Sequence, residues 1–110
     1  MGKILILANY DLGLYKFRKE LIQELLKKHE VYISLPNGEY VSNLVEIGCK
    51  FINTPINRRG TNPISDYKLL LDYINIIKKI KPTVVLTYTI KPNIYGGIAC
   101  RLIKTPYITN

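Results

Sequence analysis

The sequence predicts an α/β fold: a doubly wound, Rossmann-like parallel sheet in three α/β/α layers, with the strand order 3-2-1-4-5. Short apolar runs of strand length alternate with segments whose apolar residues have helical spacing. The connections are short, and no linker or low-complexity tract interrupts the 110 residues. This alternation indicates parallel strands joined by right-handed crossovers, with helices on both faces of the sheet.

The first half of the chain predicts three strands and two helices. The run Ile4–Ala8 is uniformly apolar, as expected of a strand that is covered on both faces. From Leu14 to Lys28 the spacing predicts one amphipathic helix, with Phe17, Leu21 and Leu25 on its apolar stripe. The other expected elements are strands at 31–35 and 50–54 and a short helix at 40–47, which ends before Gly48.

The second half predicts two helices and two strands. A long helix is expected from Pro63 to Lys79, because proline is tolerated in a first helical turn. Pro82 ends it, and strands are expected at 83–87 and 106–109. The helix between them, 93–103, contains Gly96-Gly97, and each glycine costs about 1 kcal/mol relative to alanine. Close packing of this helix on the sheet is the favoured explanation, ahead of ligand approach.

Composition narrows the class of protein. Sixteen Lys and Arg against eight Asp and Glu give a net charge of +8, which favours an anionic partner. The length excludes a complete two-domain enzyme, and no apolar stretch is long enough to span a membrane. Cys49 and Cys100 show no metal-ligand or disulfide pattern, so we expect no metal site and a cytoplasmic location.

Ligands of doubly wound sheets bind at the carboxyl ends of the strands, where the strand order reverses. The order 3-2-1-4-5 places that crevice between the loops Asn9–Gly13 and Tyr88–Asn93. Neither a dinucleotide fingerprint nor a P-loop is present. Gly13 either admits a ligand to the backbone or makes a turn, and Asp11 is either a general base or a cap.

Three cations are predicted to bind phosphate at the same edge. Lys91 precedes a helix start, where a phosphate is favoured, and Arg58 and Arg59 either grip phosphate bidentately or are simply solvated. Lysines spread over several helices argue against nucleic acid as the partner. The expected substrate-binding residues are Asn9, Gly13, Arg58, Arg59, Tyr88, Thr89, Lys91 and Asn93, with Asp11 as the catalytic candidate.

Several segments resemble the amino-terminal domain of bacterial family 4 glycosyltransferases, most of all the subgroup that builds capsule, O-antigen and related surface polysaccharides. The resemblance implies a GT-B architecture, in which residues 1–110 form a truncated amino-terminal domain and the carboxy-terminal donor domain is absent. The segments that carry the resemblance are 14–18, 25–31, 57–63 and 87–93, together with Gly96-Gly97.

The family's residue roles transfer position by position. Gly13 matches the loop that faces the donor phosphates, and Arg58 and Arg59 match a basic loop on the acceptor side. Lys91, with Pro92 and Asn93, matches the loop that lines the cleft. Many members have histidines where this sequence has Tyr88 and Thr89, so a histidine-based role does not transfer.

The resemblance therefore implies an acceptor-binding domain that needs no metal or cofactor. The donor is a nucleotide-sugar bound mostly by the missing domain, supplied in cis or in trans. The acceptor is a phosphorylated or lipid-linked glycan at the inner face of the membrane, next to anionic headgroups. The isolated chain is expected to be inactive. The alternative is a non-catalytic Rossmann-like binding module, or the membrane-recruiting partner of a split glycosyltransferase.

Overall fold

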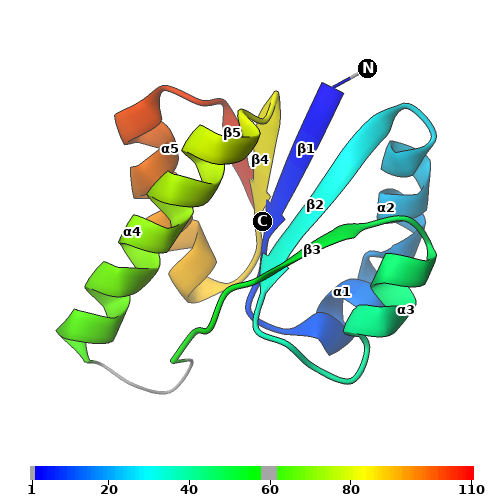
Figure 1. Ribbon diagram of the computed structural model, residues 1–110, viewed down its shortest axis with the longest axis horizontal. Helices are drawn as coiled ribbons and strands as arrows, with labels where there is room; N and C mark the ends of the chain where they lie inside the picture. The colour runs from blue at the N-terminus through cyan, green and yellow to red at the C-terminus, as the bar shows by residue number, and fades with distance from the viewer. Residues whose placement is uncertain (1, 58–61) are drawn as a thin grey trace.

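Five parallel strands form a single sheet, shown in Figure 1 with the carboxyl ends of the strands at its lower edge. The structure is a computed structural model that describes residues 2–57 and 62–110. The strands are β1 (Gly2–Leu7), β2 (His29–Leu35), β3 (Lys50–Asn53), β4 (Val84–Thr87) and β5 (Tyr107–Thr109). Their order is β3-β2-β1-β4-β5, which confirms the predicted topology.

Helices cover both faces of the sheet and complete the three layers. They are α1 (Asp11–Phe17), α2 (Lys19–Leu26), α3 (Val41–Glu46), α4 (Pro63–Ile80), the π-helix η1 (Pro92–Gly96) and α5 (Gly97–Ile103). Figure 1 shows α1, α2 and α3 on one face, and α4 and α5 on the other.

The central strand, β1, is buried on both faces. Leu5, Ile6 and Leu7 each have 0% exposure. Ile6 packs in the core shared with α2 and α3, whereas Leu5 and Leu7 pack in the core shared with α4 and α5. A continuous apolar run suits this position because each face of the strand needs its own row of apolar side chains.

β1 also fixes where the neighbouring strands end. It pairs in parallel with β2 and with β4, and Leu7 lies opposite both Ser34 and Thr87. Because these three residues are in register, the segments that follow β1 and β4 leave the same edge of the sheet side by side. This is the point at which the strand order reverses.

The predicted helix over 14–28 is wrong in one respect, because the structure contains two helices that meet at Arg18. That residue has φ −122° and ψ 7°, outside the α-helical region. The break shifts the apolar stripe, so that Phe17 is 73% and Leu21 is 41% exposed, while Ile22 is buried. The sequence gives no sign of this break, because the apolar spacing runs through it and no glycine or proline stands beside Arg18.

Gly96 allows the last helical segment to approach the sheet closely. A Cβ at this position would lie 2.6 Å from Leu7 Cδ1 and 3.1 Å from Thr87 Cγ2. A Cβ at the following residue, Gly97, would lie 3.3 Å from the Tyr107 ring. Close packing on the sheet, the explanation favoured from the sequence, is therefore confirmed.

Replacing Gly96 with alanine should destabilise the protein. The added methyl group overlaps Leu7, and overpacking of a core costs about 1–3 kcal/mol. Gly13→Ala is the matched control: a Cβ there meets nothing within 4 Å, so the alanine should raise the free energy of unfolding by up to about 1 kcal/mol. Urea unfolding of both variants measures the difference, and equal effects would contradict this packing.

Both cysteines are buried, one in each core. Cys49 packs on the face covered by α2 and α3, and Cys100 packs on the face covered by α4 and α5. Burial raises the pKa of each thiol to about 11. Since the thiolate is the reactive form, neither side chain is a nucleophile near neutral pH.

We therefore expect both thiols to resist alkylation in the folded protein. At pH 8, iodoacetamide should label neither cysteine of the native chain, and should label both in denaturant, as read by intact-mass spectrometry. Rapid labelling of one thiol under native conditions would show that its part of the core opens easily.

Candidate functional site

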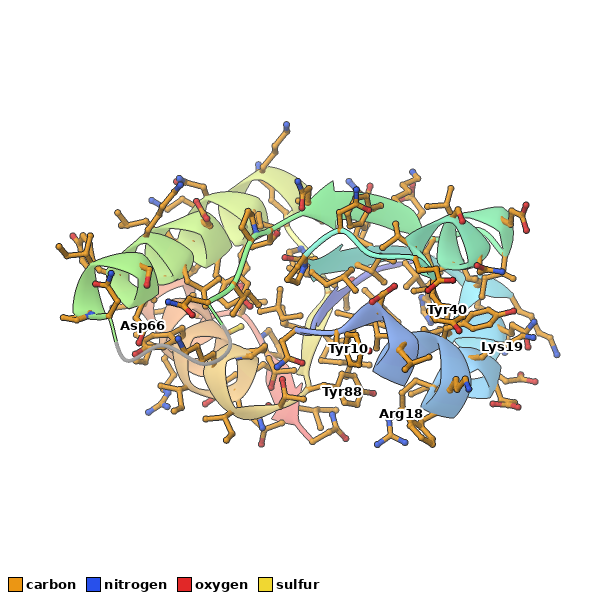
Figure 2. All side chains as sticks on the ribbon, turned by 90° about the horizontal axis from the view of Figure 1, so that it is seen from below. Tyr10, Arg18, Lys19, Tyr40, Asp66 and Tyr88 are labelled. Carbon is orange, nitrogen blue, oxygen red and sulfur yellow. The ribbon has the colours of Figure 1, made fainter. Side chains whose placement is uncertain are left out.

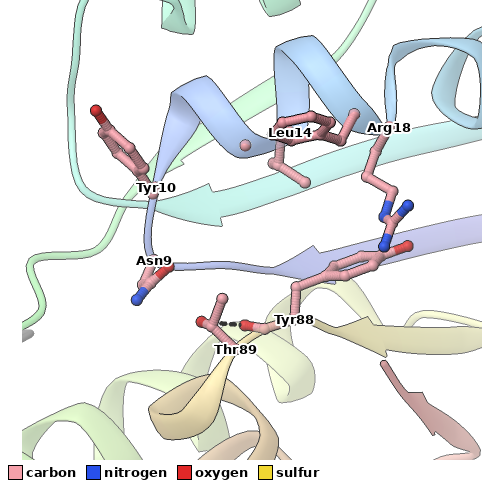
Figure 3. Close-up of a pocket in the computed structure, with 8 residues that line it drawn as sticks. Asn9, Tyr10, Leu14, Arg18, Tyr88 and Thr89 are labelled. Atoms are coloured by element: carbon pink, nitrogen blue, oxygen red, sulfur yellow. Dashed lines mark hydrogen bonds between the residues drawn. The ribbon is translucent and has the colours of Figure 1, made fainter.

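A hollow of about 400 Å³ opens at the carboxyl ends of β1 and β4 (Figure 3). It lies in the crevice predicted from the strand order. Four predicted site residues, Asn9, Gly13, Tyr88 and Thr89, come together here. The complete lining is Asn9, Tyr10, Gly13, Leu14, Phe17, Arg18, Tyr88 and Thr89. Apolar and aromatic walls with a few polar groups are typical of small-molecule sites.

Backbone pairing continues for one residue beyond β4 and positions Tyr88. Its N–H donates to the Leu7 carbonyl oxygen at 2.9 Å, and the Tyr88 side chain is only 9% exposed. On the other side of β1, the N–H of Ala8 donates to the Ser34 carbonyl at 3.0 Å. The floor of the hollow is thus an extension of the sheet itself.

Thr89 turns the chain sharply away from the sheet. Its φ is 73°, a left-handed conformation that a β-branched residue rarely adopts. The Thr89 hydroxyl donates to the carbonyl of Tyr88 (Figure 3). Strain of this kind costs about 1–3 kcal/mol and is concentrated at functional sites. The π-helix η1 follows three residues later, and π-helical turns are also frequent at such sites.

Sequence reasoning missed Arg18, which lines the hollow from the junction of α1 and α2. Its guanidinium carbon lies 5.2 Å from the centroid of the Tyr88 ring, a cation–π arrangement visible in Figure 3. In the helix expected over 14–28, Arg18 lies four residues after Leu14 and four before Ile22, within the apolar stripe. Only the break at Arg18 and the pairing of β4 with β1 bring it over Tyr88, and apolar spacing signals neither.

Gly13 does not make a turn, because it lies within α1. A Cβ there would meet no other atom within 4 Å, so the helix is open toward the hollow at this point. The structure leaves room for the ligand approach at Gly13, which stays a prediction.

Asp11 is buried and its carboxylate is already engaged. Oδ2 accepts a hydrogen bond from the N–H of Tyr40 at 2.6 Å, which ties the start of α1 to the loop after β2. A Cβ at Gly38 would lie 2.5 Å from Asp11 Oδ1, so the loop needs a glycine at that point. Asp11 does not line the hollow. The geometry gives it a structural role, and its part in catalysis stays a prediction.

Lys91 points to α4 and not into the hollow. Its Nζ donates to Asp66 Oδ1 at 2.7 Å and to the carbonyl of Asn57. The hydroxyl of Tyr95 donates to Asp66 Oδ2 at 3.1 Å. Figure 2, a view onto the carboxyl edge of the sheet, shows Asp66 well apart from Tyr88. Phosphate binding by Lys91 stays a prediction, one that would require the ammonium to leave this ion pair.

The remaining predicted site residues also lie outside the hollow. Asn93 accepts a hydrogen bond from the Thr87 hydroxyl at 2.7 Å and donates to the Asn110 carbonyl at 3.0 Å. It therefore links η1 to β4 and to the residue that follows β5. Arg58 and Arg59 fall outside the described residues.

The Lys91–Asp66 pair should make stability depend on pH at the acid end. The hydrogen bond from Lys91 holds the pKa of Asp66 below its usual value of 3.8. A lowered folded-state pKa means that the pair stabilises the fold above about pH 4 and that this contribution is lost as pH falls through the lower value.

Asp66→Asn and Lys91→Met should each flatten the fall in unfolding free energy between about pH 5 and pH 2. Urea unfolding at intervals across that range measures the slope. If the unfolding free energy of the wild type and of both variants falls with the same slope below pH 5, the pair does not stabilise the fold.

Comparison with known proteins places the chain in a family. Residues 3–110 match the family described as Glycosyl transferase 4-like, and the chain belongs to it. The relative N,N'-diacetylbacillosaminyl-diphospho-undecaprenol alpha-1,3-N-acetylgalactosaminyltransferase of Campylobacter jejuni is 27% identical over 106 residues. That match covers 96% of this chain and 28% of the transferase.

Solved structures share the fold. A glycosyltransferase from Rickettsia africae superposes with a TM-score of 0.80 at 21% identity, over 98% of this chain and 29% of that protein. MurG of Acinetobacter baumannii gives 0.74 at 17% identity, over 99% of this chain and 33% of that protein. The chain thus spans about a third of the length of these proteins, or less, and corresponds to one Rossmann-like domain of the GT-B fold.

Two further findings concern the described part of the chain. No three His, Cys, Asp or Glu side chains gather there in a way that could hold a metal ion. None of the helices in residues 2–57 and 62–110 is long and apolar enough to cross a bilayer.

Proposed function

We propose that this chain is the acceptor-binding domain of a glycosyltransferase that transfers a sugar from a nucleotide-sugar to a lipid-linked glycan of the cell surface. The observation that carries the proposal is the hollow of about 400 Å³ at the carboxyl ends of β1 and β4, in a chain of the Glycosyl transferase 4-like family. This edge of the sheet is where doubly wound domains bind their ligands.

The lining of the hollow suits a sugar. Tyr10 and Phe17 are 47% and 73% exposed and offer aromatic surface at the rim. Asn9 and Thr89 offer an amide and a hydroxyl group that can hydrogen-bond sugar hydroxyls. In a mostly apolar wall, a few polar groups fix the orientation of such a ligand.

The relative from Campylobacter jejuni supports the proposed class of acceptor. Its name gives a sugar joined through diphosphate to undecaprenol as the molecule to which N-acetylgalactosamine is added. We extend to this chain only that chemical class, a glycan carried on a polyprenyl diphosphate. Capsule and O-antigen assembly both fit within it. The donor nucleotide-sugar would be held mainly by a second domain, with no metal or cofactor required.

Such an acceptor resides in a membrane, so we further propose that the chain works at the cytoplasmic surface of the bilayer. The net charge of +8 favours an anionic surface. Three exposed apolar residues on α4, Ile64, Tyr67 and Leu71, recur at intervals of three and four and provide apolar contact area beside Lys68.

A variant that fills the hollow tests the proposed function. Gly13→Trp should abolish sugar transfer by the chain joined to, or mixed with, a carboxy-terminal donor domain. It should leave folding intact because the position opens into free space. Transfer is measured from a panel of nucleotide-sugars to membrane lipid extracts. Ser42→Trp, on the exposed face of α3, is the matched control and should retain activity.

Two results would contradict the proposal. One is the absence of transfer with every donor despite stable association of the two domains, which would favour a binding module instead. The other is full activity of Gly13→Trp, which would place the acceptor elsewhere on the domain.

A further inference from the structure

Arg18 lies over the ring of Tyr88. The guanidinium carbon lies 5.2 Å from the centroid of the Tyr88 ring. A guanidinium held over an aromatic ring by a cation–π contact can still donate its N–H groups to an oxyanion as a fork. Among the described residues, no carboxylate forms an ion pair with Arg18.

The platform beneath Arg18 is rigid. Tyr88 is 9% exposed, its N–H is bonded to Leu7, and the next residue is held in a strained left-handed conformation. The strained conformation of Thr89 lowers the stability of the fold, and strain of this kind is concentrated at functional sites. An arginine that rests on a fixed ring loses less conformational freedom when it binds.

The charge of the hollow is uniformly favourable to an anion. Its lining includes one cation, Arg18, and no acidic residue. The nearest acid on the same helix, Asp11, turns its carboxylate toward the N–H of Tyr40. Lys91 is held by Asp66 outside the hollow. The predicted phosphate-binding role of Lys91 is thus better met by Arg18.

We propose that Arg18 is the oxyanion anchor of the hollow and that the ligand is a sugar bearing an oxyanion, its ring against the aromatic rim and its charge on the guanidinium edge. This inference rests on the proposed function and deepens it, because it identifies the group that recognises the charge of the acceptor. A phosphate on the carrier or a carboxylate on an acidic sugar supplies the same chemistry, and the experiment separates them.

Calorimetric binding to the 110-residue chain tests the anchor with three probes: N-acetylglucosamine 1-phosphate, glucuronate and N-acetylglucosamine. The wild type should bind at least one anionic probe about tenfold more tightly than the neutral sugar, and Arg18→Gln should abolish that preference. The stronger of the two anionic probes identifies the source of the oxyanion.

Lys19→Gln is the matched control. Lys19 also lies over an aromatic ring, 5.1 Å from the centroid of Tyr15, but it does not line the hollow. The substitution removes the same charge and should leave the binding preference unchanged. Tyr88→Leu should weaken anion binding because it removes the platform, whereas Tyr88→Phe, which keeps the ring, should not. Thermal unfolding of each variant shows whether the fold is retained.

Equal affinity of wild type and Arg18→Gln for all three probes would overturn the inference, as would an equal loss in Lys19→Gln. The result is separable from the proposed function in the two-domain transfer assay. If transfer occurs but Arg18→Gln leaves the acceptor KM unchanged, the function stands and the anchor fails. If anionic sugars bind through Arg18 but no transfer occurs with any donor, the anchor stands and the function fails.

Discussion

The backbone hydrogen bonds that join β1 to β2 on one side and to β4 on the other determine the rest of the structure. They place Leu7 opposite both Ser34 and Thr87, so that chain segments more than 70 residues apart, Asn9–Tyr10 and Tyr88–Thr89, leave the sheet together. The hydrogen bond from the Tyr88 N–H to the Leu7 carbonyl extends this pairing to the floor of the hollow. Because β1 is apolar on both faces, a shift of one residue would exchange the side chains that pack in the two cores and would disturb the packing of both. The position of the hollow is therefore as well determined as the core.

Three departures from regular geometry lie near this edge. Thr89 adopts a positive φ, η1 forms a π-helix, and the helix that follows β1 breaks at Arg18. Each departure has a local cost, and the absence of a Cβ at Gly96 is what lets η1 approach Leu7 closely. Departures from ideal structure that gather around one hollow are expected when the position of side chains there matters more than stability. By contrast, Asp11 and the Lys91–Asp66 pair fasten loops outside the hollow, where their charged groups make structural contacts.

The sequence predicted the parallel sheet, its strand order and the crevice because these follow from apolar periodicity and chain connectivity. It also predicted the close packing at Gly96, because a glycine inside a helix lowers stability and close packing on the sheet compensates for that loss. It did not predict the break at Arg18, which lies in an unbroken apolar pattern. Nor did it predict that Lys91 pairs with Asp66, because the two residues are 25 positions apart and only the tertiary fold brings them together. Of the predicted site residues, Asn9, Gly13, Tyr88 and Thr89 meet, whereas Asp11, Lys91 and Asn93 are used in structural contacts. Arg18, which the sequence did not identify as a site residue, is exposed, and its role depends on its position over the Tyr88 ring.

We propose the hollow between α1 and β4 as the site where this domain binds its ligand. Titration of the ¹⁵N-labelled chain with N-acetylglucosamine 1-phosphate, followed by amide chemical shifts, tests it most directly. Binding in the hollow should shift only the amides of Asn9, Gly13, Arg18 and Thr89 and their neighbours, together with the side-chain Nε–H of Arg18. Shifts centred instead on a second hollow, between the loop after β3 and α4 and lined by Asn57, Ser65 and Lys68, would contradict it.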